Sequence, residues 1–132
     1  MFVTLKLAAV CAALWLGAAA PAVIQIADPE QERVVRTIPA TDSILREANA
    51  LLRHLQVYGG LRVPEGWVIR IPLPGERRID FHARTIVFSE MTLIRSRTSN
   101  RTVILIVDSG NRPYLFTADP ARMERLLQLL KM

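Results

Sequence analysis

Trp67-Val-Ile-Arg-Ile71, Ile79-Asp-Phe-His-Ala83, Thr85-Ile-Val-Phe88, Met91-Thr-Leu-Ile94 and Thr102-Val-Ile-Leu-Ile-Val107 are the apolar runs that decide the fold. They are rich in β-branched and aromatic residues, which favour strands, and turn residues separate them. The last run is apolar after its first residue, so it should be a central strand covered on both faces. The stretch from Trp67 to Phe116 therefore predicts an antiparallel meander of about five strands.

Two features of the sequence indicate where strands of this meander end or are interrupted. Pro72-Leu-Pro-Gly75 predicts that the strand before it is an edge strand or ends there, because proline donates no hydrogen bond to a neighbouring strand. Near Ser89-Glu90 the apolar alternation slips, which indicates a bulge within one long strand or a break between two.

Helical patterns lie on both sides of the meander. Thr41 or Asp42 is a suitable N-cap, and Gly59-Gly60 is expected to end a long amphipathic helix with a left-handed cap. Asp119-Pro120 begins a second, C-terminal helix. The predicted apolar stripes are Ile44, Ala48, Leu51, Leu55 and Tyr58 in the first helix, and Met123, Leu126, Leu127 and Leu130 in the second. The sequence therefore predicts one α+β domain over residues 41–132.

The segment before this domain, residues 23–40, is expected to be a linker. Asp28-Pro29 resembles a cap followed by proline at the first helical position, with acidic residues in the next turn. This pattern predicts a short helix to about Arg36, and a flexible linker is the alternative.

Residues 1–22 are expected to form an N-terminal signal peptide or membrane anchor. Lys6 precedes an apolar run that ends in Ala18-Ala-Ala-Pro-Ala22, which is typical of a cleaved secretory signal peptide. A retained membrane anchor is the alternative, because Leu7 to Ala27 is about 20 residues, enough to span a bilayer. Acidic residues follow the run, so both interpretations place the body outside the cytoplasm, exported or periplasmic or anchored in the cytoplasmic membrane.

Composition narrows the class of protein. The 132 residues are 51% hydrophobic, which excludes a disordered chain. The net charge of +5 comes from 15 arginines and two lysines against 12 acidic residues, and it would attract an anionic polymer or lipid. The one cysteine, Cys11, lies in the apolar run, so the predicted domain contains neither a disulfide nor a thiolate ligand.

The first candidate site is a row of polar residues at a spacing of two: Arg78, Asp80, His82 and Arg84. On a strand this spacing places all four on one face. Asp80 could then orient His82 as a general base, which is the basis for a hydrolase hypothesis. A solvated sheet face with alternating charges is the simpler interpretation.

The second candidate site is a predicted hairpin tip at Thr98-Ser-Asn100 that carries Arg95, Arg97 and Arg101. Guanidinium groups beside hydroxyls could bind a phosphate or sulfate. The alternative is a soluble tip whose charges protect a sheet edge. His54 and His82 lie on different predicted elements, so we expect no metal site, and no motif indicates a cofactor.

These observations favour a non-catalytic interaction or assembly domain of a cell-envelope complex, with a protein partner at the membrane or envelope. The alternatives are a module that binds small anions or anionic polymers through the hairpin arginines, and a hydrolase that uses Asp80 and His82.

Overall fold

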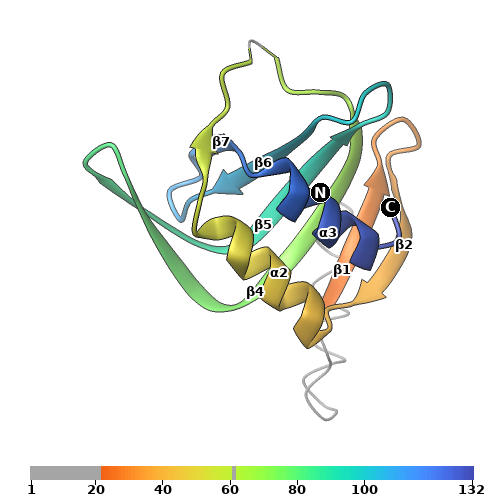
Figure 1. Ribbon diagram of the computed structural model, residues 1–132, viewed down its shortest axis with the longest axis horizontal. Helices are drawn as coiled ribbons and strands as arrows, with labels where there is room; N and C mark the ends of the chain where they lie inside the picture. The colour runs from red at the N-terminus through yellow and green to blue at the C-terminus, as the bar shows by residue number, and fades with distance from the viewer. Residues whose placement is uncertain (1–21, 61) are drawn as a thin grey trace.

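The computed structural model describes residues 22–60 and 62–132, and its centre is a seven-stranded antiparallel sheet (Figure 1). The strand order across the sheet is β2-β1-β4-β5-β6-β7-β3. The elements in chain order are β1 (Val23–Asp28), β2 (Arg33–Pro39), α2 (Asp42–Leu52), β3 (Gln56–Val57), β4 (Gly66–Phe81), β5 (Arg84–Ser96), β6 (Thr102–Val107), β7 (Pro113–Thr117) and α3 (Pro120–Leu129).

The predicted α+β arrangement of a five-stranded meander and one long helix is wrong. The protein is mostly β, with seven strands in one sheet and two short helices among the described residues. The meander itself has four strands, β4 to β7, because the first two predicted strands are one continuous strand, β4. The other three strands come from segments that the sequence pattern assigned to a linker and to the end of a helix.

The linker with a short helix, expected over residues 23–40, is also wrong, since this segment forms the β1–β2 hairpin. Ile24 and Ile26 alternate into the core, as a half-buried strand requires. The Asp28-Pro29 pair begins a turn instead of a helix. The Asp28 Oδ1 atom accepts a hydrogen bond from the Glu30 amide at 2.9 Å, the local bond through which aspartate favours turns over helices.

The long amphipathic helix is shorter than predicted. Thr41 is the N-cap, and its hydroxyl accepts a hydrogen bond from the Ile44 amide at 3.3 Å. The helix ends at Leu52, and Gln56 and Val57 then pair with the outer edge of β7. Pairing that edge satisfies backbone groups that a longer helix would leave without strand partners. Gly59-Gly60 provides no left-handed cap, because neither glycine has a positive φ.

Pro72-Leu-Pro-Gly75 does not end its strand. β4 continues through a bulge, and its register with β5 shifts from Pro72 opposite Glu90 to Arg77 opposite Phe88. Gly75 takes a φ of +76° there, a conformation that favours glycine. Pro72 lies beyond the last residue of β4 that pairs with β1, so its missing N–H costs no strand bond on that side.

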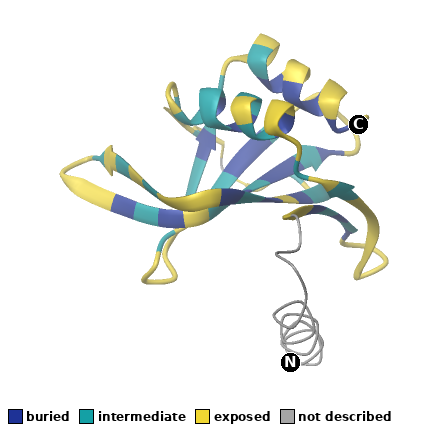
Figure 2. Ribbon diagram, turned by 90° about the horizontal axis from the view of Figure 1, so that it is seen from below, coloured by how far each residue is buried: buried dark blue, intermediate teal, exposed yellow. Residues whose placement is uncertain are grey.

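Both helices lie on one face of the sheet (Figure 2). A row of paired residues from five neighbouring strands faces them, and all of these are buried: Ile26, Ile69, Leu93, Ile104 and Phe116. The helix stripes complete this core, and the predicted stripe of the C-terminal helix is confirmed, because its four apolar residues are all buried. Arg36 of β2 donates to the carbonyl oxygens of Leu130 and Lys131, which fixes the end of α3 against the sheet.

The next row of paired residues points to the opposite face, which neither helix covers. It contains Val68, Ile94 and Val103. Ile94 and Val103 are buried without belonging to the core under the helices. Residues on the segment that joins β3 to β4, Tyr58 and Val63 among them, lie over this face beside Ile94. The helix-free face is therefore partly covered by a loop, and the open space beside that loop is the candidate site.

Candidate functional site

The predicted polar row does not form. β4 and β5 extend beyond the rest of the sheet as a two-stranded ribbon, and Phe81 pairs with Arg84, so His82 and Ala83 form the turn at its tip. Both turn residues have positive φ, 47° and 61°, as a type I′ turn requires. His82 therefore leaves the strand face that carries Arg78 and Asp80.

The hydrogen bonds of the row confirm this separation. The Asp80 carboxylate accepts a bond from the Thr85 hydroxyl at 3.0 Å, and no hydrogen bond within the described residues joins it to His82. The His82 ring instead lies edge-on to the Phe81 ring, 4.2 Å between centroids. Arg78 donates to Glu76 at 3.4 Å. The geometry on which the hydrolase hypothesis depends is therefore not present.

The hairpin arginines are only partly brought together. Arg97 and Arg101 both line an open pocket of about 890 Å³ at the end of the helix-free face. Arg95 does not line this pocket. It pairs with Trp67 on one side and Thr102 on the other, and neither of these residues lines the pocket. We call this hollow the arginine pocket; it is lined by Pro29, Glu30, Tyr58, Arg62, Val63, Pro64, Glu65, Gly66, Val68, Ile94, Ser96, Arg97, Thr98, Ser99 and Arg101.

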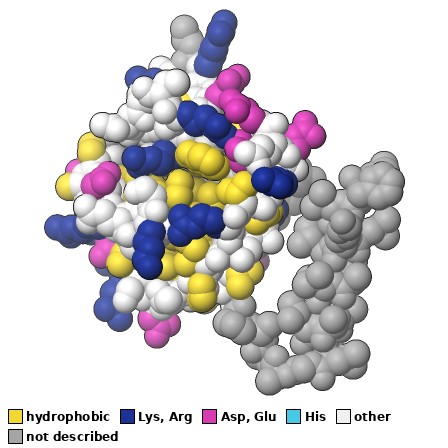
Figure 3. Space-filling model, turned by 90° about the vertical axis from the view of Figure 1, so that its right-hand side faces the viewer, with side chains coloured by type: hydrophobic (Ala, Val, Ile, Leu, Met, Phe, Trp, Pro, Cys, Tyr) yellow, Lys and Arg dark blue, Asp and Glu magenta, His cyan; other side chains and the backbone are white. Residues whose placement is uncertain are grey.

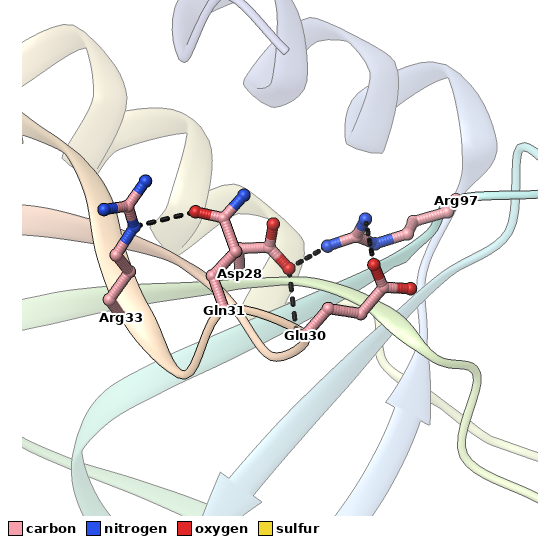
Figure 4. A network of polar contacts seen from close by, with 5 residues as sticks. All are labelled: Asp28, Glu30, Gln31, Arg33 and Arg97. Carbon is pink, nitrogen blue, oxygen red and sulfur yellow. Dashed lines mark hydrogen bonds and ion pairs between the residues drawn. The ribbon is translucent and has the colours of Figure 1, made fainter.

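Arg97 is held in a polar network that joins two hairpins (Figure 4). Its guanidinium pairs with Asp28 and donates to Glu30 at 3.3 Å. The same guanidinium lies 4.5 Å from the centroid of the Trp67 ring, within cation–π range. Only 3% of the Asp28 side chain is exposed, and Arg97 supplies its counter-charge. Arg97 is thus a structural member of the pocket wall, with its charge already balanced.

Arg101 and Arg62 are placed differently. The Tyr58 hydroxyl donates to the Arg62 carbonyl at 2.8 Å, and an Arg101 N–H donates to that hydroxyl at 3.4 Å. Neither guanidinium forms an ion pair within the described residues. These two arginines therefore supply the cationic surface of the arginine pocket that a ligand could use.

Gly66, one of the lining residues of the arginine pocket, lies very close to the neighbouring strand. A Cβ atom at this position would lie 1.7 Å from the Arg95 carbonyl oxygen on the neighbouring strand. Only glycine permits this approach of β4 to β5, and the approach brings the Glu65–Gly66 segment against Ser96 and Arg97.

A second open pocket, of about 570 Å³, adjoins the first. We call it the apolar pocket; it is lined by Val57, Tyr58, Val63, Phe81, Ile94, Leu105, Pro113, Tyr114, Leu115 and Phe116. Phe81 reaches it from the end of the β4–β5 ribbon, and its ring packs edge-on against Phe116 with 5.3 Å between centroids. Tyr58, Val63 and Ile94 line both pockets, so the two form one groove with a cationic end and an apolar end.

The edge of β2 is the other exposed surface with apolar character. On that side of the molecule, apolar side chains lie among basic ones (Figure 3). Val34 and Val35 are exposed there. Val35 is the extra residue of a bulge, since the register with β1 passes from Arg36 to Val34, and Pro39 ends the strand. Bulges and prolines are features that oppose the addition of a further strand to an edge, so this surface is a weaker candidate than the groove.

The sequence pattern identified Arg97 and Arg101 but missed the groove. Tyr58 was assigned to a helix stripe, and Arg62 carries no pattern of its own. Gly59-Gly60 and Pro64 could have indicated a loop at this point, but nothing in the spacing shows that the loop crosses the sheet.

The described residues offer little chemistry beyond this groove. No three His, Cys, Asp or Glu side chains among them are close enough to form a metal site, and neither α2 nor α3 is long and apolar enough to cross a bilayer.

The pKa of Arg70 is raised, chiefly because its guanidinium donates to the Glu90 carboxylate at 2.6 Å. The predicted targeting segment, residues 1–22, lies outside the described residues except for Ala22.

Comparisons of the chain with protein-family models, with curated proteins and with solved structures give no match.

Proposed function

We propose that this protein is a non-catalytic binding domain that acts outside the cytoplasm, in a cell-envelope assembly, and that it binds its partner in the groove. The observation that carries this proposal is the pair of adjoining pockets, which extend from the helix-free face to consecutive residues of β7, near the edge of the sheet. Ligand sites are concave and mostly apolar, with a few polar groups that fix orientation. The groove has this composition.

A polyanion partner is less well supported. The arginine pocket is lined by three arginines and two glutamates, so its net charge is only one positive, and Arg97 is already paired with Asp28 and Glu30. A polyanion would gain affinity by neutralising many phosphates, each adding about −0.9 to the salt slope on duplex DNA. Two usable arginines would give a slope no steeper than about −2.

The proposed location is supported by the targeting segment together with the fold. The last part of the apolar run, Val23 to Ala27, belongs to β1, and its isoleucines are core residues. The uninterrupted apolar run before Val23, Leu7 to Ala22, is then 16 residues long. This is shorter than the 17–25 or so residues of a spanning helix, which favours the cleaved signal peptide. An alkaline phosphatase fusion at the C-terminus should be active, whereas activity of a cytoplasmic reporter alone would refute export.

Site-specific photo-crosslinking in cells tests the binding function. A photoreactive residue replaces Val63, at the junction of the two pockets, and in a second strain it replaces Val107, which is 45% exposed like Val63 but lines neither pocket. We expect a discrete crosslinked product, a protein or a small molecule, at position 63 and none at position 107. Equal labelling at both positions, or none at either, would contradict the proposal.

A further inference from the structure

We infer that the groove binds an anionic amphiphile, a molecule with one carboxylate head group and one alkyl chain. The head group lies in the arginine pocket and the chain lies in the apolar pocket. This inference rests on the proposed binding function and names the chemical class of the ligand.

The lining of the apolar pocket suits an alkyl chain better than a peptide. It contains no charged side chain, and its only side-chain polar groups are the hydroxyls of Tyr58 and Tyr114. The Tyr58 hydroxyl already bonds to the Arg62 carbonyl and Arg101. A buried peptide would bring an N–H and a carbonyl with each residue, and these groups lose free energy when they are left without partners. An alkyl chain has no such groups.

The arginine pocket suits a single negative charge. Arg62 and Arg101 can each donate a pair of hydrogen bonds to a carboxylate, and the hydroxyls of Thr98 and Ser99 lie in the same lining. The lining has three arginines and two glutamates, and Asp28 beside it balances Arg97, so the surplus of positive charge is at most one and suits a single carboxylate better than a dianion. A phosphate monoester carries about −1.5 to −2 at neutral pH, and would leave negative charge uncompensated beside Glu30 and Glu65.

The size and continuity of the groove fit a molecule of this kind. The apolar pocket has a volume of about 570 Å³. That volume is within the usual 300–1,000 Å³ or so of small-molecule sites. Because three residues line both pockets, a chain can pass from one to the other without leaving the protein surface. Each methylene that the pocket buries should tighten binding by up to about fourfold.

Calorimetric titration of the full-length protein tests this inference with four probes below their micellar concentrations: decanoate, decyl phosphate, the neutral decyl glucoside and acetate. Two variants alter the groove, Val63→Asp at the junction and Arg101→Gln at the head-group site. Two matched variants leave it intact, Val107→Asp with the same exposed fraction of 45%, and Arg84→Gln on the ribbon. All proteins carry the same N-terminal apolar segment, so that segment cannot cause a difference among them.

We expect decanoate to bind at least as tightly as decyl phosphate, and acetate to bind too weakly to measure. The neutral probe and each groove variant should lose about tenfold or more in affinity, while the matched variants stay within about twofold. Equal binding of decyl glucoside, no effect of Arg101→Gln, or equal loss in Val63→Asp and Val107→Asp would each overturn the inference.

The crosslinking experiment separates this inference from the proposed function. If no amphiphile binds but position 63 crosslinks to a protein, the ligand class is wrong and the binding function stands. If no amphiphile binds and position 63 does not crosslink, both are refuted.

Discussion

Replacing Arg97 by glutamine should destabilise the protein far more than removing an ordinary surface arginine. Asp28 is 2% exposed, and after the change its carboxylate would keep only the Glu30 amide as a partner in the network. Removing one partner of a buried ion pair costs about 3–5 kcal/mol, since the other charge stays buried without compensation. The Arg97 side chain is 28% exposed, so water can partly replace it, and we expect a loss of about 2–4 kcal/mol.

A double-mutant cycle isolates the pair. Asp28→Asn keeps an acceptor for the Glu30 amide and removes the buried charge, so it should relieve much of the cost of Arg97→Gln. We expect the double variant to be more stable than the sum of the two single changes predicts, by about 1–3 kcal/mol.

Arg70→Gln is the matched control. Arg70 likewise makes two hydrogen bonds to acidic side chains, here both to the Glu90 carboxylate, but the Arg70 and Glu90 side chains are 48% and 38% exposed. An exposed pair of this kind contributes about 0.2–1 kcal/mol. Unfolding in urea, followed by far-ultraviolet circular dichroism, gives the free energy of unfolding of the unaltered protein and of each of the four variants. If Arg97→Gln is no more destabilising than Arg70→Gln, the claim that burial of Asp28 makes its partner essential is refuted.

Three further changes test the fold. Ile104→Ala should cost about 2–5 kcal/mol in urea unfolding because it leaves a cavity under the helices, whereas His82→Ala should cost less than about 1, and the reverse order would contradict the core assignment. Gly66→Ala should prevent stable folding or shift β4 away from β5, since its Cβ would meet the Arg95 carbonyl oxygen at 1.7 Å; a thermal melt equal to that of the unaltered protein would refute this contact. Ala83→Gly should raise the free energy of unfolding by about 0.5–1 kcal/mol. The change relieves about 1–2 kcal/mol of left-handed strain at φ +61° and costs about 0.5–1 kcal/mol in chain entropy. A lower melting temperature would show that the turn is unstrained.

The sequence predicted those parts of the fold in which the local pattern of apolar residues matches the burial that the tertiary structure imposes. Thr102 to Val107 is an interior strand, and Ile104 and Ile106 are fully buried, as its continuous apolar pattern indicates. The strand is not covered on both faces along its whole length, as predicted, because Leu105 is half-buried and Val107 is exposed. The buried positions of β5 change phase near Ser89-Glu90, where the predicted slip lies and where the register with β4 shifts. Strand periodicity is local information, and at these points it was sufficient.

The errors arise where one local pattern is compatible with two structures. Asp28-Pro29 followed by acids can begin a helix or a turn, and pairing of β1 with β4 decides for the turn. Leu55 and Tyr58 continue a helical spacing, but the open edge of β7 takes Gln56 and Val57 as a strand. In both cases the observed structure depends on strand partners that are distant in the sequence. The local periodicity of apolar residues carries no information about such partners.

The groove could not be predicted for the same reason, and its existence follows from how the two faces of the sheet are covered. The helices bury one face only, so the apolar residues of the other face need a different cover. The segment from β3 to β4 supplies part of it with Tyr58 and Val63, and the pockets are the spaces on either side. The Asp28–Arg97 network then holds the β1–β2 turn against the β5–β6 hairpin, so the wall of the arginine pocket is fixed before any ligand arrives. Because a preformed site loses less conformational entropy on binding, Arg97→Gln should weaken ligand binding in the groove even though Arg97 need not touch the ligand.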